Sequence, residues 1–165
     1  QKFKDEAVSV YRHFKLKPTI TGATVTIPKI DYETENVIPG VHVRVSTGYR
    51  GHDRSVAVMG NIAYPVDVPN PEQLGVLKGL LDCGLEMHFS IGELDFQASR
   101  EGLSYIPETI AAIKTKLEAL NGQLAIHIAN EANKIDNLWE RALYLSKRHN
   151  DYLFTQAVVD RKSVV

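Results

Sequence analysis

The feature that most constrains the fold is an apolar repeat near the end of the chain. Hydrophobic side chains recur at steps of three or four from Ile110 to Leu145, which is the spacing of one helical face. A helix of about 40 residues is about 60 Å long, whereas a typical strand spans about 20 Å. A small sheet cannot cover such a helix. We therefore expect either a break near Gly122 with the second half folding back, or a second half, including Trp139, that stays exposed for a partner.

Upstream of this repeat, the chain has the patterns of β-strands. Alternating or continuously apolar stretches predict strands over 18–27, 41–46, 55–64 and 85–96, the last with a bulge near Glu93. Pro71 and a leucine stripe predict a helix over 71–83, so 55–96 has the order strand–helix–strand. These elements predict an α+β protein with a mixed sheet, helices on one face, and a long C-terminal helix or helix pair.

The domain organisation follows from the same patterns. We expect a linking helix over 1–17, an α+β domain over 18–106, a long helical segment over 107–150 that packs on this domain or extends from it, and a tail over 151–165. Because the chain begins with Gln1 rather than Met, we interpret it as a piece of a longer protein.

Composition excludes several classes of protein. The 165 residues are 44% hydrophobic and 24% charged, which is ordinary for a globular chain, and the formal net charge of −1 argues against a protein that coats nucleic acid. A single cysteine, Cys83, excludes an intramolecular disulfide framework and suits the cytoplasm. The chain lacks a run of about 18 apolar residues, so we expect no transmembrane segment. Peripheral membrane association stays open.

Few residues have a spacing that indicates chemistry. None of the six histidines stands at a metal-ligand spacing from another, so we expect no metal site. Cys83 and His88 could form a nucleophile–base pair, but packing at a helix end is the favoured interpretation of this cysteine. The loop over 48–54, rich in glycine and arginine, could hold an anion, although a solvated hairpin loop is favoured.

The segment from Glu93 to Tyr105 is the most suggestive part of the chain. It places Ser99 and Arg100 in a short loop between the end of a strand and the start of a helix. An arginine at such a junction can reach a phosphate that another domain holds. A surface arginine at a sheet edge is the alternative.

This segment also carries a resemblance to a known family. Residues 84–105 resemble the end of the transducer domain of the gyrase, heat-shock chaperone and MutL ATPases, which belong to the GHKL superfamily. In the MutL branch a strand reading Asp-Val-Asn-Val-His-Pro leads, one residue later, to a lysine. The stretch Glu93-Leu-Asp-Phe-Gln-Ala-Ser-Arg100 has the same apolar alternation, with Arg100 in place of that lysine. Residues 59–65 and 99–105 also look like phage rIIA-type proteins, and the resemblance covers about 18–150.

The resemblance implies a function that the fragment would not perform alone. ATP and Mg²⁺ would bind an N-terminal ATPase domain of the same chain, because the superfamily's Asp-x-Gly-x-Gly motif is absent here and no cofactor is expected in the fragment. Ser99 and Arg100 would lie at the nucleotide, and Arg100 would contact the γ-phosphate in the catalytic step. The family further implies a left-handed crossover over 55–96, a possible homodimer, and the cytoplasm of an infected bacterium.

Three hypotheses about function follow from these features. In the first, the chain is a transducer that senses the γ-phosphate through Arg100 and relays the nucleotide state along the helix 107–149. In the second, it is a protein interaction module that uses the apolar stripe of that helix. In the third and weakest, it binds nucleic acid through the 48–54 loop and the basic end at 147–149.

Overall fold

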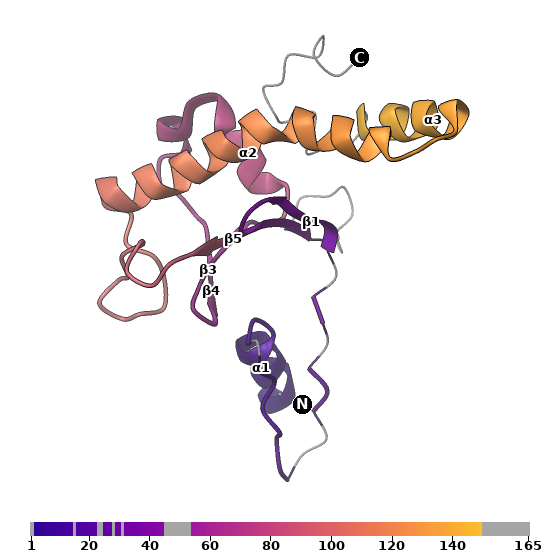
Figure 1. Cartoon of the computed structure of the whole chain (residues 1–165). Coiled ribbons are helices and arrows are strands. Elements are labelled where there is room, and N and C mark those ends of the chain that lie inside the picture. Colours follow the sequence, from indigo (N-terminus) through magenta and orange to yellow (C-terminus); the bar gives the residue numbers. More distant parts are fainter. Residues whose placement is uncertain are drawn as a thin grey trace.

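The computed structural model describes residues 2–14, 16–22, 25–27, 29–30, 32–44 and 54–149. Figure 1 shows these elements in chain order. They are α1 (Lys2–Tyr11), β1 (Tyr32–Ile38), β2 (Val41–Arg44), β3 (Val56–Met59), β4 (Ile62–Pro65), the 3₁₀ helix η1 (Pro71–Asp82), β5 (Leu85–Phe89), α2 (Pro107–Asn133) and α3 (Leu138–His149). The predicted tail over 151–165 lies outside the described residues.

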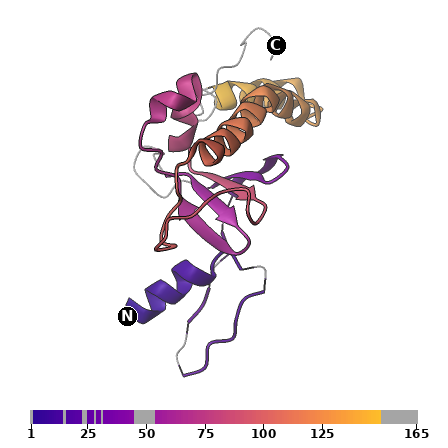
Figure 2. The same cartoon turned by 90° about the vertical axis from the view of Figure 1, so that its left-hand side faces the viewer.

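The strands of the described part form one mixed sheet. Their order is β1-β2-β5-β3-β4, with a parallel pair between β3 and β5 and antiparallel pairs elsewhere. Helices η1, α2 and α3 lie on one side of this sheet, and α1 lies on the other side (Figures 1 and 2). The predicted α+β class, with a mixed sheet, covering helices and a C-terminal helix pair, is confirmed.

The core lies between the sheet and the helices η1 and α2. Alternate residues of a strand point to one face, so Val41, Val43, Leu85 and Met87 pack toward the helices in a single buried cluster. Residues of α2 at steps of three and four complete this cluster, and their spacing matches one helical face. They are Ile113, Leu117, Leu120, Leu124 and Ile128.

The first two strand predictions are wrong in part. The described residues of 18–27 contain no strand, and β1 forms instead from the polar segment Tyr32–Ile38. The turn at Pro39–Gly40, where Gly40 has a φ of 76°, folds β1 back onto β2. An edge strand pairs on one side only and tolerates polar side chains, so the pairing partner decides this strand rather than its hydrophobicity. Residues 45–46 of the second predicted strand lie outside the described part.

The stretches over 55–64 and 85–96 are each shorter as strands than predicted. A two-residue turn at Gly60-Asn61 splits the first into the hairpin β3–β4, with Met59 paired to Ile62. The glycine that indicated a bulge is thus a turn residue with a φ of 64°. The second ends at Phe89. After Phe89 the chain turns, and the Glu93 amide donates to the carbonyl of Ser90. The predicted bulge near Glu93 is therefore a turn, and the strand does not continue.

The strand–helix–strand unit is present with two changes. β3 and β5 are parallel neighbours, as expected, but the connection between them contains β4 as well as the helix. That helix, η1, is of the 3₁₀ type and has a kink at Gly75, whose φ is 58°. The left-handed crossover stays a prediction.

The long helical segment breaks, although not near Gly122. α2 continues through Gly122 and ends at Asn133, and α3 begins at Leu138. Asn137 causes the restart, because its Oδ1 accepts hydrogen bonds from the backbone amides of Trp139 and Glu140 at 2.9 and 3.2 Å. A glycine costs a helix about 1 kcal/mol, and the packing of buried α2 residues on both sides of it outweighs this cost. The predicted exposure of Trp139 is confirmed, since the residue is 77% exposed.

Gly122 provides a test of this packing argument. It is exposed, and a Cβ added there would meet nothing within 4 Å. Gly122→Ala should raise the free energy of unfolding by about 0.5–1 kcal/mol, as expected for alanine in a continuous helix. Urea denaturation followed by circular dichroism measures this change.

Gly40 serves as the matched control. Its φ is 76°, and an added Cβ would lie 3.5 Å from His88 Cβ. Gly40→Ala should lower the free energy of unfolding by about 1–2 kcal/mol, because alanine is strained at positive φ. A loss of stability in Gly122→Ala would contradict a helix that continues through residue 122.

Candidate functional site

Arg100 lies at the tip of a closed loop between β5 and α2. A bridge between Phe96 and Leu103 closes this loop, and the Gln97 amide donates to the carbonyl of Gly102 at 3.0 Å. The Arg100 amide donates to the carbonyl of Gln97 at 2.8 Å. Hydrogen bonds within the loop therefore hold the backbone of Arg100 in place.

The backbone of Arg100 has an unusual conformation. Its φ is 57°, and it is the one residue other than glycine with a positive φ in the part of the chain that the structure describes. Such a conformation costs an ordinary residue about 1–2 kcal/mol. Strained positions of this kind concentrate at functional sites, where the surrounding structure holds them.

The loop is also fastened to its neighbours at both ends. The Asp95 amide donates to Thr109 Oγ1 at 3.1 Å, which joins the start of the loop to the first turn of α2. Thr109 is completely buried. At the other end, the hydroxyl of Tyr105 accepts a hydrogen bond from the Asp67 amide at 2.6 Å, which joins the loop to the segment after β4.

The side chains of Ser99 and Arg100 lie where the sequence predicted. Both residues are exposed in the loop after β5. Ser99 Oγ accepts a weak hydrogen bond from the Glu101 amide at 3.4 Å. Among the ion pairs of the described residues, none involves Arg100. The guanidinium is thus free to meet an anion from outside this chain segment.

A second polar site lies on the opposite side of the sheet, and the sequence analysis missed it. Glu86 of β5 points away from α2 and is only 1% exposed. Its Oε1 accepts a hydrogen bond from the Tyr32 hydroxyl at 2.7 Å and lies 2.9 Å from His88 Nε2. Its Oε2 lies 3.6 Å from Nδ1 of His13, which follows α1. The ring of His42 stacks on Tyr32 and contacts His88 edge-on.

The electrostatics of Glu86 follow from these neighbours. Burial by itself would raise the pKa of the Glu86 carboxyl, but the contacts with His13, His88 and Tyr32 outweigh burial and hold that pKa well below its usual range. Glu86 is therefore an ionised carboxylate inside the protein. It connects the sheet to the segment that follows α1.

This cluster explains where sequence reasoning failed. His13, His42 and His88 belong to three different segments, so no fixed spacing between them could reveal their contact. Even so, no group of three or more histidine, cysteine or acidic residues is placed to hold a metal ion within the described ranges. A glutamate between leucine and methionine in an apolar strand was the available signal.

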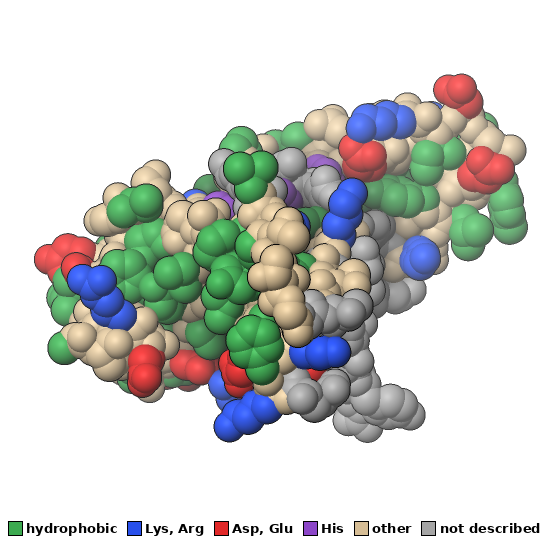
Figure 3. Space-filling model, turned by 90° about the horizontal axis from the view of Figure 1, so that it is seen from below, with side chains coloured by type: hydrophobic (Ala, Val, Ile, Leu, Met, Phe, Trp, Pro, Cys, Tyr) green, Lys and Arg blue, Asp and Glu red, His purple; other side chains and the backbone are tan. Residues whose placement is uncertain are grey.

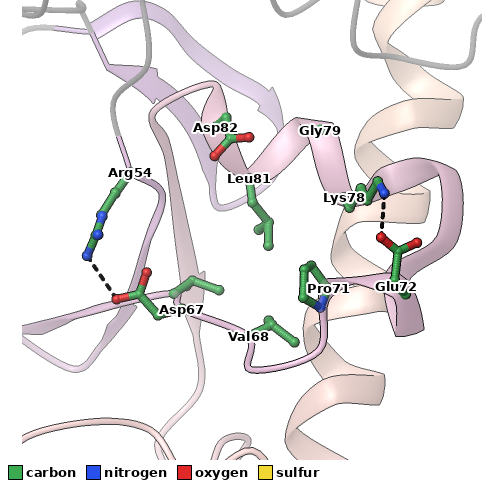
Figure 4. A pocket seen from close by; sticks show the side chains of 10 residues that line it. Arg54, Asp67, Val68, Pro71, Glu72, Lys78, Gly79, Leu81 and Asp82 are labelled. Atoms are coloured by element: carbon green, nitrogen blue, oxygen red, sulfur yellow. Dashed lines mark hydrogen bonds and ion pairs between the residues drawn. The ribbon is translucent and has the colours of Figure 1, made fainter.

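The remaining candidates contribute less. Cys83 is buried and its thiol donates to the carbonyl of Gly79 at 3.5 Å, while His88 contacts Glu86 instead. A cavity of about 590 Å³ lies beside η1, but four of its five charged side chains form two ion pairs, Arg54 with Asp67 and Lys78 with Glu72 (Figure 4). The 48–54 loop lies outside the described residues except for Arg54.

Within the described residues, no helix combines the length and the apolar character that crossing a membrane requires. Searches of protein-family models, curated proteins and solved structures find no match to this chain.

The buried carboxylate predicts a specific pH dependence. A carboxyl whose folded pKa is depressed stabilises the fold above its unfolded pKa, and this contribution is lost as pH falls toward the folded pKa. Glu86→Gln should lower the free energy of unfolding by about 3 kcal/mol at pH 7, as breaking a buried ion pair does. The difference in free energy of unfolding between Glu86→Gln and the unsubstituted protein should become smaller at pH values below the ordinary glutamate range.

Urea denaturation at pH 7, 5 and 3 measures both effects. Glu118→Gln is the matched control, because its carboxylate is exposed and lies 4.0 Å from Lys114. It should change stability by less than about 0.5 kcal/mol at pH 7. Parallel pH profiles for Glu86→Gln and the unsubstituted protein would show that Glu86 does not stabilise the fold as a carboxylate.

Proposed function

We propose that this chain is the transducer part of a GHKL-type ATPase, in which Arg100 contacts the γ-phosphate of ATP. The ATP and its Mg²⁺ would be held by an N-terminal ATPase domain of the same protein. The observation that carries this proposal is the geometry of Arg100, an exposed cation without an ion-pair partner in the described residues, held at a positive φ on the tip of a fastened loop.

The loop has the properties that such a contact requires. A charged donor stabilises a developing charge best when its position is set before the reaction, because no further reorganisation is then needed. The hydrogen bonds of Gln97 and Arg100 set the loop backbone in this way. Ser99, next to Arg100, offers a hydroxyl to the same phosphate.

The connection to α2 supports the relay of nucleotide state. The bond between the Asp95 amide and Thr109 Oγ1 joins the loop to α2, which is 27 residues long. A helix of that length spans about 40 Å. In this proposal a displacement of the loop by the γ-phosphate moves the start of α2, and the rigid helix carries the displacement to α3.

The order of the elements supports the proposal in part. β3 and β5 are parallel neighbours followed by α2, as the resemblance implies, but their connection contains β4 in addition to η1. Arg100 replaces the lysine of the related ATPases. It retains the positive charge and adds a planar fork that can bind two phosphate oxygens at once.

Substitution of Arg100 tests this function in the longer protein that the proposal implies. Arg100→Ala should slow ATP hydrolysis roughly 100-fold, as the loss of a transition-state donor does. Arg100→Lys should retain part of the activity, because the charge remains. Steady-state hydrolysis measured beside thermal melting separates the effect on turnover from an effect on folding.

Arg100→Gly is the control for backbone strain. Glycine adopts a φ of 57° without cost, so this variant should melt at or above the temperature of the unsubstituted protein. It should nevertheless hydrolyse ATP as slowly as Arg100→Ala. Full activity in either variant would remove the γ-phosphate role, and a large loss of melting temperature in Arg100→Ala would make Arg100 a structural residue.

A second function, a protein interaction module, is favoured by one observation on α3. Leu138, Trp139 and Leu143 are 77%, 77% and 62% exposed. Trp139 and Leu143 are four residues apart and share one face of α3, with Leu138 beside Trp139. At the right of Figure 3, hydrophobic side chains are exposed among charged ones. Exposed apolar groups of this size are typical of interaction surfaces.

Trp139→Ala tests the second function. An exposed tryptophan contributes little to folding, so this substitution should change the free energy of unfolding by less than about 0.5 kcal/mol. If α3 mediates self-association, the dimer fraction in sedimentation velocity should fall. An unchanged sedimentation profile together with a large loss of melting temperature would reverse this interpretation.

A further inference from the structure

A cavity of about 290 Å³ lies on the side of the sheet opposite α2. Arg12 and His13 border it from the segment after α1, Tyr32 borders it from β1, and Glu86 and His88 border it from β5. Lys17, Lys29 and Ile30 complete its lining. This cavity is separate from the Arg100 loop, and neither proposed function uses it.

The charge of the lining side chains favours an anion. Arg12, Lys17 and Lys29 carry positive charges and Glu86 carries one negative charge, so the described lining has a formal excess of two positive charges before the two imidazoles are counted. The Glu86 carboxylate already contacts Tyr32 and His88. A metal cation would be repelled by three ammonium or guanidinium groups, whereas a dianion would balance the excess.

An unsatisfied donor points to the same conclusion. The Arg12 Nε atom is buried and has no hydrogen-bond partner among the described residues. His13 Nδ1 and Glu86 Oε2 are also without one, but these two atoms face each other at 3.6 Å. The His13 side chain is only 6% exposed, although its residue lines the cavity. Buried polar groups are nearly always hydrogen-bonded in native proteins, so the open Arg12 donor beside a cavity indicates a ligand with acceptor atoms.

The individual groups have distinct roles in such a site. Lys17 Nζ donates to the carbonyl of Tyr11 at 3.2 Å, which caps the last turn of α1 and offsets the negative end of that helix. Arg12 and Lys29 form no ion pair within the described residues and remain available to a ligand. Glu86 acts as a positioning residue. Its carboxylate contacts the ring of His88 on the same strand and holds the segment of His13 against the sheet.

We infer that this cavity binds a phosphate group, as inorganic phosphate or as a small phosphomonoester, through Arg12 and Lys29, beside the imidazoles of His13 and His88. A phosphate dianion supplies acceptor oxygens in several directions and matches both the excess charge and the open Arg12 donor. The volume of about 290 Å³ accommodates such a group with a small substituent.

Histidine NMR signals test the inference directly. Sodium phosphate is titrated at constant pH and ionic strength, with chloride as the replaced anion, and the imidazole Cε1–Hε1 signals are followed. The signals of His13 and His88 should shift with saturation, while His127 on α2 should not move. A parallel titration with glycerol 3-phosphate compares a phosphomonoester with inorganic phosphate. The ligand with the lower Kd shows whether the site selects an esterified or a free phosphate.

Lys29→Gln is the informative variant, because Lys29 is exposed and its loss leaves the core intact. It should weaken phosphate binding roughly tenfold, as the loss of one charge-assisted contact does. Lys4→Gln, on the exposed surface of α1, should bind as the unsubstituted protein does. Arg100→Ala should also bind normally, which separates this site from the proposed γ-phosphate contact.

Three results would overturn the inference. One is a linear drift of the histidine signals without saturation, and another is an equal response to phosphate at His127. The third is unchanged affinity in Lys29→Gln and in Arg12→Gln, each verified as folded by its circular dichroism spectrum.

Discussion

The structure depends on β5, a strand of five residues with buried side chains on both faces. Leu85 and Met87 are 0% exposed on the side of α2, and Glu86 is 1% exposed on the other side. β5 also lies between β2 and β3, so hydrogen bonds hold it along both edges. Because successive side chains of a strand point to opposite faces, this one strand anchors the helical layer and the N-terminal segment together.

The two faces use different physical interactions. On the side of α2, burial of leucine, isoleucine, valine and methionine side chains stabilises the fold, at about 25 cal/mol for each Å² of apolar surface removed from water. On the side of α1, a buried carboxylate contacts two imidazoles and a phenol. Apolar packing tolerates many sequences, whereas a buried carboxylate requires specific partners in specific positions. The α1 side is therefore the more sensitive to single substitutions.

The chain after β5 links strand, loop and helix within a short segment. Phe89 ends the strand, the loop that carries Arg100 follows, and Pro107 starts α2. The loop is fastened to α2 through Thr109 and to the segment after β4 through Tyr105. In the proposed function, the residue that meets the phosphate is thus held by the same elements that would receive its displacement. The cavity proposed to bind phosphate lies on the opposite face of the sheet, and Glu86 and His88 of β5 line it. The same strand therefore leads into the Arg100 loop and borders the cavity.

Local sequence patterns predicted the features that depend on residues close together in the chain. Alternation and helical spacing indicated the α+β class, the helix near Pro71, the loop position of Arg100 and the exposure of Trp139. Turn residues were harder to assign, since Gly60 fits a bulge or a hairpin turn equally well until its pairing partner is known. The break at Asn137 rather than Gly122 also depended on context, because packing around α2 outweighs the cost of one glycine.

The sequence by itself determined which faces are apolar, because that property resides in the spacing of side chains. Only the tertiary structure decided which polar segment becomes a strand and which charged residue becomes buried. β1 exists because β2 offers it an edge, and Glu86 is buried because His13, Tyr32 and His88 converge on it from distant parts of the chain. Burial of a charge requires partners on other elements, and the identity of those partners is set by the fold rather than by any local pattern.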